Sequence, residues 1–281
     1  MKNSFMENVI TERLEALRTE LRREHLSAFV LSAEGSCWIS GNDKAEGIAV
    51  VMQEDVELWK KEEYPTLTAA IPAIAEWLQE QFEKKKFQSP EIGIDGMQTS
   101  TADVEALKEQ MKHRGGITIR TNFDPIERVG KNNPNPLITP IKLISPTEQT
   151  TQKLARIRQE LRKQHADGML ATRRENVAWT LNLQTPDETS GKAAESYLLI
   201  ASNKATLFVD SRRASNEVRA YLATQGVEVK EQKEISKGLK DYFEYNILVD
   251  PDEVCYTLYK KITRIVVFGE SPITTMRGVS S

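Results

Sequence analysis

The sequence predicts an α/β protein of two tandem, related domains, each with a mixed β-sheet flanked by helices. The first observation is an internal repeat, because residues 20–25 read ELRREH and residues 160–165 read ELRKQH. The second is the alternation of helical patterns with short apolar strands after each repeat. The third is a pair of adjacent strands in each half, which implies an antiparallel pair within a sheet otherwise joined by crossovers.

The first helix of each half carries its apolar residues at helical spacing. His25 and His165 end these helices at equivalent positions. A cation near a helix C-terminus is favourable, and a lone histidine without a second ligand is a poor metal signature. We therefore expect both to mark helix ends, and His113 to mark another. The equivalent apolar residues are Leu14, Leu17 and Leu21 in the first half and Leu154, Ile157 and Leu161 in the second.

Strands and further helices follow in the same order in both halves. Asp95 and Asp250 each follow a strand, and an aspartate there commonly caps the next helix, so we expect a structural role for both. A metal-dependent nuclease would need several carboxylates in one half. Strands are expected at residues 28–31, 48–52, 56–59, 92–95, 117–119, 168–171, 197–201, 206–210, 247–250 and 264–268. Helices are expected at 102–112 and 253–261 and between Ser215 and Gly226.

A proline-rich segment separates the halves. Residues 130–140 hold three prolines, which exclude helix and interrupt strand pairing. Residues 145–148, SPTE, then have the pattern of a helix start. The predicted domains are residues 1–139 and 140–281.

Composition excludes several classes of protein. The net charge of −3 offers no basic excess for binding nucleic acid, and no apolar run is long enough to cross a membrane. Cys37 and Cys255 lack paired spacing, so we expect neither a disulfide nor a zinc site. Cys37, next to a tryptophan, is expected to be buried as a small apolar residue. Together these features predict a cytoplasmic protein.

Motifs for catalysis are missing from the sequence. It contains no G-x-S-x-G nucleophile turn and no glycine-rich phosphate loop. The best remaining candidates for a functional role are Trp179 and Asn182. The alternative is that Trp179 simply belongs to the core, since tryptophan usually contributes burial first.

An ordered set of short segments carries a family resemblance along almost the whole chain. The chain resembles the N-terminal region of three-domain cytosolic Xaa-Pro aminopeptidases (aminopeptidase P). In the second half the matching segments are KLARIR (153–158), WTLNLQ (179–184), ATLFVD (205–210) and ESPITTMRGV (270–279). In the first half they are RLEALR (13–18), WISG (38–41) and AEWL (75–78).

The resemblance implies two creatinase-N-like domains, followed in the family by a catalytic pita-bread domain. That third domain holds two divalent metal ions, with manganese expected, so this chain is expected to have no cofactor and no catalytic residue of its own. Its expected roles are to shape substrate access, with Trp179 and Asn182 near the groove facing the catalytic domain, and to dimerise. The implied partners are the catalytic domain, a second copy and, through the parent enzyme only, a peptide.

Two alternatives remain open at this stage. Residues 41–47 and 187–195 depart from the family pattern, which favours a stand-alone peptide-binding or assembly module without peptidase activity. A two-domain enzyme would instead require a deep pocket lined with several acids or histidines.

Overall fold

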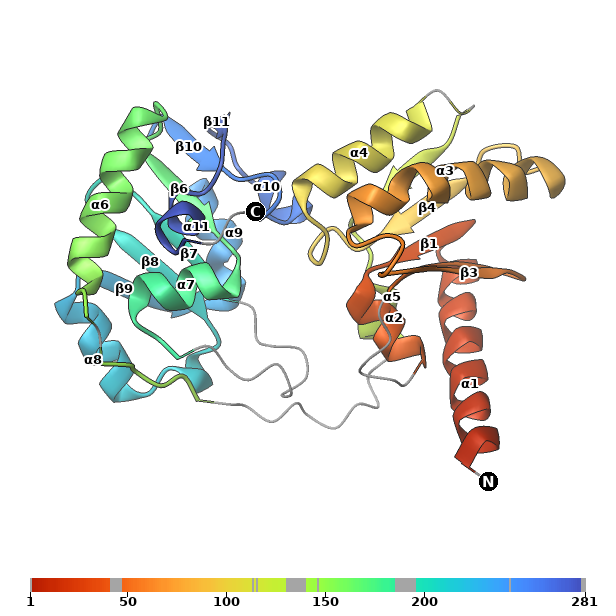
Figure 1. Ribbon diagram of the computed structural model, residues 1–281, viewed down its shortest axis with the longest axis horizontal. Coiled ribbons are helices and arrows are strands. Elements are labelled where there is room, and N and C mark those ends of the chain that lie inside the picture. Colours follow the sequence, from red (N-terminus) through yellow and green to blue (C-terminus); the bar gives the residue numbers. More distant parts are fainter. Residues whose placement is uncertain are drawn as a thin grey trace. The chain divides into compact units, whose positions relative to one another are not determined.

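The computed structural model describes residues 2–40, 47–112, 114, 116–129, 140–145, 147–184, 196–242 and 244–278. The chain divides into two compact units, Met1–Pro134 and Asn135–Ser281 (Figure 1). Each unit contains a mixed sheet flanked by helices, which confirms the predicted fold class. The predicted boundary between residues 139 and 140 borders a range outside the described residues and stays a prediction. In the described part of the chain, no helix is long and apolar enough to cross a bilayer.

Unit 1 has a five-stranded sheet in the order β3-β2-β1-β4-β5. β2 pairs antiparallel with β3, as predicted, and also with β1. β1 pairs parallel with β4, and β4 with β5. The elements are α1 (Lys2–Arg23), β1 (Ala28–Leu31), α2 (Ala33–Ser40), β2 (Gly47–Met52), β3 (Val56–Lys60), α3 (Leu67–Lys84), β4 (Glu91–Ile94), α4 (Thr101–Lys112), β5 (Thr118–Arg120) and α5 (Pro125–Val129).

Unit 2 repeats this strand order and adds one strand, giving β11-β10-β6-β7-β8-β9. The extra strand, β9, pairs parallel with β8. The elements are α6 (Thr150–Lys163), β6 (Gly168–Ala171), α7 (Arg174–Leu181), β7 (Tyr197–Ile200), β8 (Ala205–Val209), α8 (Asn216–Thr224), β9 (Val227–Glu231), α9 (Ile235–Lys240), β10 (Asn246–Val249), α10 (Tyr256–Tyr259), β11 (Ile265–Phe268) and α11 (Pro272–Met276).

The repeated apolar face of the first helix packs on its own sheet in each unit. Leu154, Ile157 and Leu161 are at most 2% exposed, and Leu17 and Leu21 are fully buried. Burial of one such side chain contributes about 1.5–3 kcal/mol, so this face fastens the helix to the sheet. The helical spacing seen in the sequence is therefore confirmed.

The two repeated histidines end α1 and α6 through their backbone conformation. Both have φ of 57°, the left-handed region. The His165 N–H donates to the carbonyl of Arg162 at 3.1 Å, and the Ala166 N–H donates to that of Leu161 at 2.9 Å. His25 ends α1 with the same pair of bonds. This is the Schellman arrangement, so the helix-end position is confirmed. His113 lies outside the described residues.

Three local predictions about helices were wrong. α6 begins at Thr150 rather than at residues 145–148, because Ile144 is tied by its N–H to the carbonyl of Asn182 at 3.0 Å, which keeps the preceding segment extended. The helix predicted over residues 253–261 is the single turn α10. Asp95 and Asp250 do not cap the helix that follows their strand: each carboxylate accepts the N–H two residues ahead, at 2.8 and 3.1 Å, and closes a turn.

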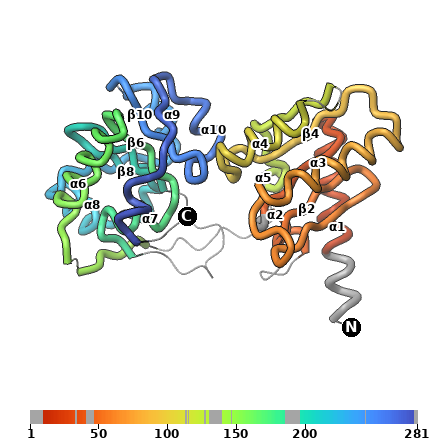
Figure 2. Tube along the Cα trace, turned by 45° about the horizontal axis from the view of Figure 1, so that its top comes forward, coloured from red at the N-terminus to blue at the C-terminus, as the bar shows by residue number. Residues whose placement is uncertain are grey.

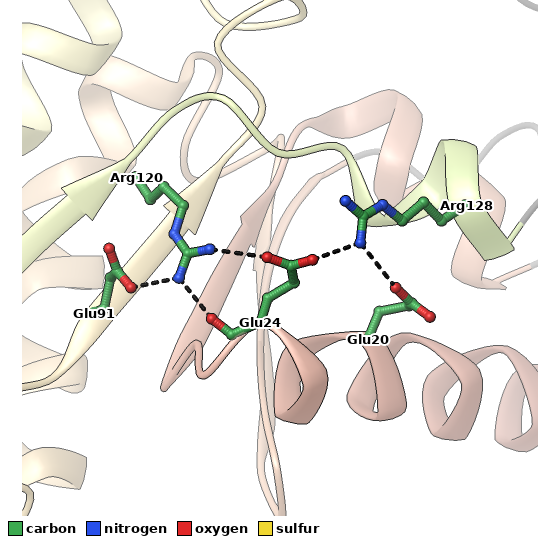
Figure 3. A network of polar contacts seen from close by, with 5 residues as sticks. All are labelled: Glu20, Glu24, Glu91, Arg120 and Arg128. Carbon is green, nitrogen blue, oxygen red and sulfur yellow. Dashed lines mark hydrogen bonds and ion pairs between the residues drawn. The ribbon is translucent and has the colours of Figure 1, made fainter.

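A cluster of ion pairs joins the end of α1 to β4, β5 and α5 of unit 1 (Figure 3). Glu24, at the end of α1, pairs with Arg120 of β5 and with Arg128 of α5. Arg120 also pairs with Glu91 of β4, and Arg128 with Glu20. The Arg128 hydrogen bond lowers the pKa of Glu24. The cluster ties β4, β5 and α5 to one helix end.

The left-handed residue at the end of α6 yields a test. Replacement of His165 by glycine is expected to raise the free energy of unfolding by about 0.5 kcal/mol, because glycine adopts this conformation without strain. His165→Val is expected to lower it by about 1–2 kcal/mol. Urea unfolding measures both, and the His25 pair of variants should behave alike. A destabilising His165→Gly variant would show that the imidazole itself holds the helix end.

Candidate functional site

The helix α7 carries three buried polar positions at its inner face and its end. Asn176 and Thr180 are fully buried, and Asn182 is 1% exposed. Buried polar groups are stable only when they are hydrogen-bonded. The partners of α7 form two networks, one toward α6 and one toward the end of the chain.

Lys153 of α6 organises the first network. This lysine is only 6% exposed. Its Nζ donates to the carbonyl oxygen of Trp179 and to Oδ1 of Asn182, both at 2.6 Å, and lies 4.4 Å from the centroid of the Trp179 ring. Burial lowers the pKa of Lys153. The ammonium group is held by two oxygens and an aromatic face, which replace its lost hydration.

Asn182 ends α7 and completes this network. It has φ of 56°, so it closes the helix in the left-handed conformation. Its Nδ2 lies 3.1 Å from the carbonyl oxygen of Glu148, 3.2 Å from Oγ1 of Thr150 and 3.1 Å from the hydroxyl of Tyr221. The side chain therefore binds α6 and α8 to the end of α7.

The structure brings Trp179 and Asn182 together on one lysine. Trp179 is partly buried and packs against the unit 2 core, as the structural alternative expected. A role of either residue in substrate access stays a prediction. Lys153 was missed by sequence reasoning, although the repeat offered a signal, since Arg13 holds the matching position. Arg13 donates to the Trp38 carbonyl and lies 5.5 Å from the centroid of that ring.

Glu253 organises the second network, at the carboxyl ends of the parallel strands. It is 9% exposed. Its Oε1 accepts the N–H groups of Thr172 and Arg173, both at 2.9 Å, and its Oε2 accepts Nδ2 of Asn176 at 2.8 Å. Burial raises the pKa of Glu253, while these donors act in the opposite direction. The carboxylate fixes the turn that leads from β6 into α7.

The same network fastens α11 to α7. Asn176 also donates to Oγ1 of Thr274 at 2.9 Å and accepts from Nη1 of Arg277 at 2.8 Å. Oδ2 of Asp250 accepts the N–H of Ser271 at 2.8 Å. Figure 2 shows the dark-blue end of the chain beside α7. The orientation of α11 is therefore set by side chains from α7 and from the loop after β10.

A cavity of about 340 Å³ lies within unit 2, between the β7–β8 face and α9. Glu234, Asp241 and Glu244 are among its lining residues. Glu244 already accepts the N–H of Ser202 at 2.9 Å, and Glu234 accepts that of Glu231 at 3.2 Å. Two of the three acids thus serve local structure.

The described residues do not fit a dinuclear metal centre. No three histidine, cysteine or acidic side chains converge within the described ranges. The oxygens of Asp250 and Glu253 are occupied by N–H donors, as given above. A catalytic metal needs at least three protein ligands, so no metal-dependent step is assigned to these side chains.

The chain contains an N-terminal domain of the creatinase and prolidase type. A family model described as "Creatinase/Prolidase N-terminal domain" matches residues 131–280, which is more than half of the 281 residues. The chain belongs to this family.

Individual relatives are Xaa-Pro aminopeptidases. Proteins named probable Xaa-Pro aminopeptidase P from Sclerotinia sclerotiorum and Botryotinia fuckeliana are 28% and 27% identical over 248 and 260 residues. Each match covers 80% of this chain, but 40% and 39% of those proteins. The chain thus spans about two fifths of their length, and the resemblance to Xaa-Pro aminopeptidases is confirmed.

A solved structure shares the fold. The X-prolyl aminopeptidase from Caenorhabditis elegans, described as a cytosolic enzyme with a di-nuclear active site, matches with a TM-score of 0.81 at 16% identity. The match covers 97% of this chain and 52% of that enzyme. At this identity the likeness establishes the fold alone.

Lys153 gives a direct test of the first network. Lys153→Met is expected to lower the free energy of unfolding by about 2 kcal/mol or more, because two buried oxygens lose their donor. Lys153→Arg is expected to lose less than half of that free energy, since Arg13 makes the equivalent contact to a tryptophan carbonyl in unit 1. The exposed Lys163→Met is the control, expected within about 0.5 kcal/mol of wild type. Equal losses in Lys153→Met and Lys163→Met in urea unfolding would contradict the role of Lys153.

Glu253 gives a pH-dependent test of the second network. Because its pKa is raised in the folded state, its contribution to stability is full below the ordinary value of 4.5 and is lost as the pH rises through the raised pKa. The stability of wild type relative to Glu253→Gln should therefore fall as the pH rises above 4.5. Unfolding curves at several pH values measure this difference. Glu217→Gln, at an exposed position, is the control. An increase with pH in the stability of wild type relative to Glu253→Gln would contradict the assignment.

Proposed function

We propose that this chain is the non-catalytic N-terminal region of an Xaa-Pro aminopeptidase-like metallopeptidase. The observation that carries the proposal is the second network, in which the carboxylate of Asp250 holds the start of α11 and that of Glu253 holds the start of α7. The relatives support it, because about three fifths of their length lies outside the match. In the proposed enzyme, that remaining part supplies the metal ions and the chemistry.

The proposal also assigns the two units as copies of one creatinase-N-like domain. Supporting contacts recur at matching places. Arg18 and Arg158 donate through Nε to the carbonyls of Met52 and Ala201, at 3.0 and 2.8 Å, where β2 and β7 end. These bonds join the first helix to the antiparallel strand pair in both units.

Trp179 is proposed to border the path of a peptide substrate, and Asn182 to position it. Asn182 and Lys153 hold the backbone and ring of Trp179, while part of the indole stays exposed. An aromatic side chain fixed in this way offers an apolar surface at low entropic cost. Peptide binding would then occur through the parent enzyme only. Cytoplasmic localisation is part of the proposal, and it is supported by the nematode enzyme, which is described as cytosolic.

Activity assays test this proposal. The chain alone, with an Xaa-Pro peptide and added manganese, is expected to give no turnover above background. A chimera that joins it to the rest of the Sclerotinia sclerotiorum protein is expected to cleave the peptide. In that chimera, Trp179→Ala should raise KM several-fold with little change in kcat, because uniform binding is lost.

The outcomes separate the alternatives. Turnover by the chain alone would place a catalytic site within it. An inactive but folded chimera, together with binding of Xaa-Pro peptides by the isolated chain in calorimetry, would favour a stand-alone peptide-binding module. Trp77→Ala, in a tryptophan that packs on Trp59 within unit 1 with ring centroids 5.7 Å apart, is the control for general effects of removing an indole.

A further inference from the structure

The cavity of unit 2 is enclosed between its sheet and α9. Lys204, just before β8, and Thr206 and Phe208 within it all line the cavity, because alternate residues of a strand share one face. At Gly238 of α9, an added Cβ would lie 2.4 Å from Cζ of Phe208, so the missing side chain lets the helix rest on this ring. The volume of about 340 Å³ falls within the range of small-molecule sites.

Thr206 places a buried hydroxyl group at this cavity. The residue is 5% exposed, and among the described residues nothing donates to its Oγ1 or accepts from it. The backbone of Thr206 is paired on both sides, with Leu199 of β7 and Glu228 of β9, so the side chain is held in place. A buried polar group without a partner is uncommon and unfavourable. The hydroxyl therefore points to a polar group of a ligand.

Charged side chains stand where the cavity opens to solvent. Lys204, Lys237 and Asp241 are exposed lining residues, and none of them forms an ion pair with another residue that the structure describes. The other acids of the lining, Glu234 and Glu244, accept backbone N–H groups. Two ammonium groups and one carboxylate are thus available to a ligand.

The balance of charge selects the class of ligand. Three lysines and three acidic residues line the cavity, and the third lysine, Lys230, is already paired with Glu228 at 3.3 Å. A simple anion would face the acids and a metal ion would face the lysines, whereas a zwitterion meets both signs favourably. Leu199, Ala201 and Phe208 give the cavity an apolar inner surface. A matching ligand therefore carries both charges and an apolar part.

We propose that this cavity binds a free amino acid with an apolar side chain, such as leucine. The order of groups along β8, from cation to hydroxyl to aromatic ring, sets the orientation of the ligand. The carboxylate lies beside Lys204 and accepts a hydrogen bond from the Thr206 hydroxyl, while the apolar side chain continues onto Phe208. Across the cavity, Asp241 at the end of α9 pairs with the ammonium group of the ligand.

Binding of small molecules to the whole chain tests the proposal. Calorimetry with L-leucine is expected to show saturable binding, and leucine should raise the unfolding midpoint as its concentration increases. Leucine amide lacks the carboxylate and N-acetyl-leucine lacks the ammonium group, so each should bind about tenfold more weakly or worse. Glycine, which lacks the apolar side chain, should also bind about tenfold more weakly.

Two conservative variants connect the binding to this cavity. Thr206→Val is expected to weaken leucine binding by about tenfold, while its unfolding midpoint stays unchanged or rises, because the substitution removes an unpartnered hydroxyl. Asp241→Asn should weaken leucine binding by about tenfold but leave the binding of N-acetyl-leucine unchanged, since that ligand has no ammonium group to lose. Thr118→Val, at an exposed position of β5 in unit 1, is the matched control and should bind leucine like wild type.

Several outcomes would overturn the proposal. They are the absence of both heat and a midpoint shift with leucine, equal binding of leucine amide or N-acetyl-leucine, and a folded Thr206→Val variant that binds like wild type. Tighter binding of glycyl-leucine or of inorganic phosphate would assign the cavity to a peptide or an anion instead. Circular dichroism shows whether each variant is folded, and Asp241→Asn, which changes an exposed side chain, tests the cavity independently of the buried substitution. The readout is binding by the chain itself, so the result is independent of the proposed peptidase role.

Discussion

A cation on the first helix holds the end of the second helix in each unit, and the local architecture around both helices depends on this contact. In unit 2 the cation is Lys153, which binds the last turn of α7 through the Trp179 carbonyl and the Asn182 side chain. In unit 1 Arg13 binds the Trp38 carbonyl. A carbonyl at a helix C-terminus has no partner inside the helix, and it carries partial negative charge. The cation supplies both the missing donor and the opposite charge.

Both ends of α7 are therefore fixed by long-range side-chain contacts. Glu253 holds the N-terminal turn through two backbone N–H groups, and Lys153 holds the C-terminal turn. Between them, Asn176 links the helix to α11. This rigidity suits a surface that presents Trp179 in one orientation, as the proposed role in a peptidase requires. The two buried polar side chains within α7, Asn176 and Thr180, are both hydrogen-bonded.

Periodic local patterns in the sequence were sufficient to predict most of the architecture. The buried face of α6 and the β7–β8 hairpin were both predicted, because their signals lie within a few residues. The start of α6 was not, because Ile144 is held by Asn182 from a distant part of the chain. The strand β9 was not identified, since its pairing with β8 across α8 decides its conformation. In the first network, Trp179 and Asn182 were singled out from the sequence for a role in substrate access, which stays a prediction. The buried Lys153 resembles any helix-surface lysine in the sequence.

The additional strand in unit 2 changes the environment of its neighbour. β8 is an interior strand with all five residues buried, while β3, in the matching place of unit 1, is an edge with one buried residue. A strand enclosed on both sides accepts few replacements during evolution, whereas an open strand tolerates many. The two halves are therefore expected to diverge at different rates.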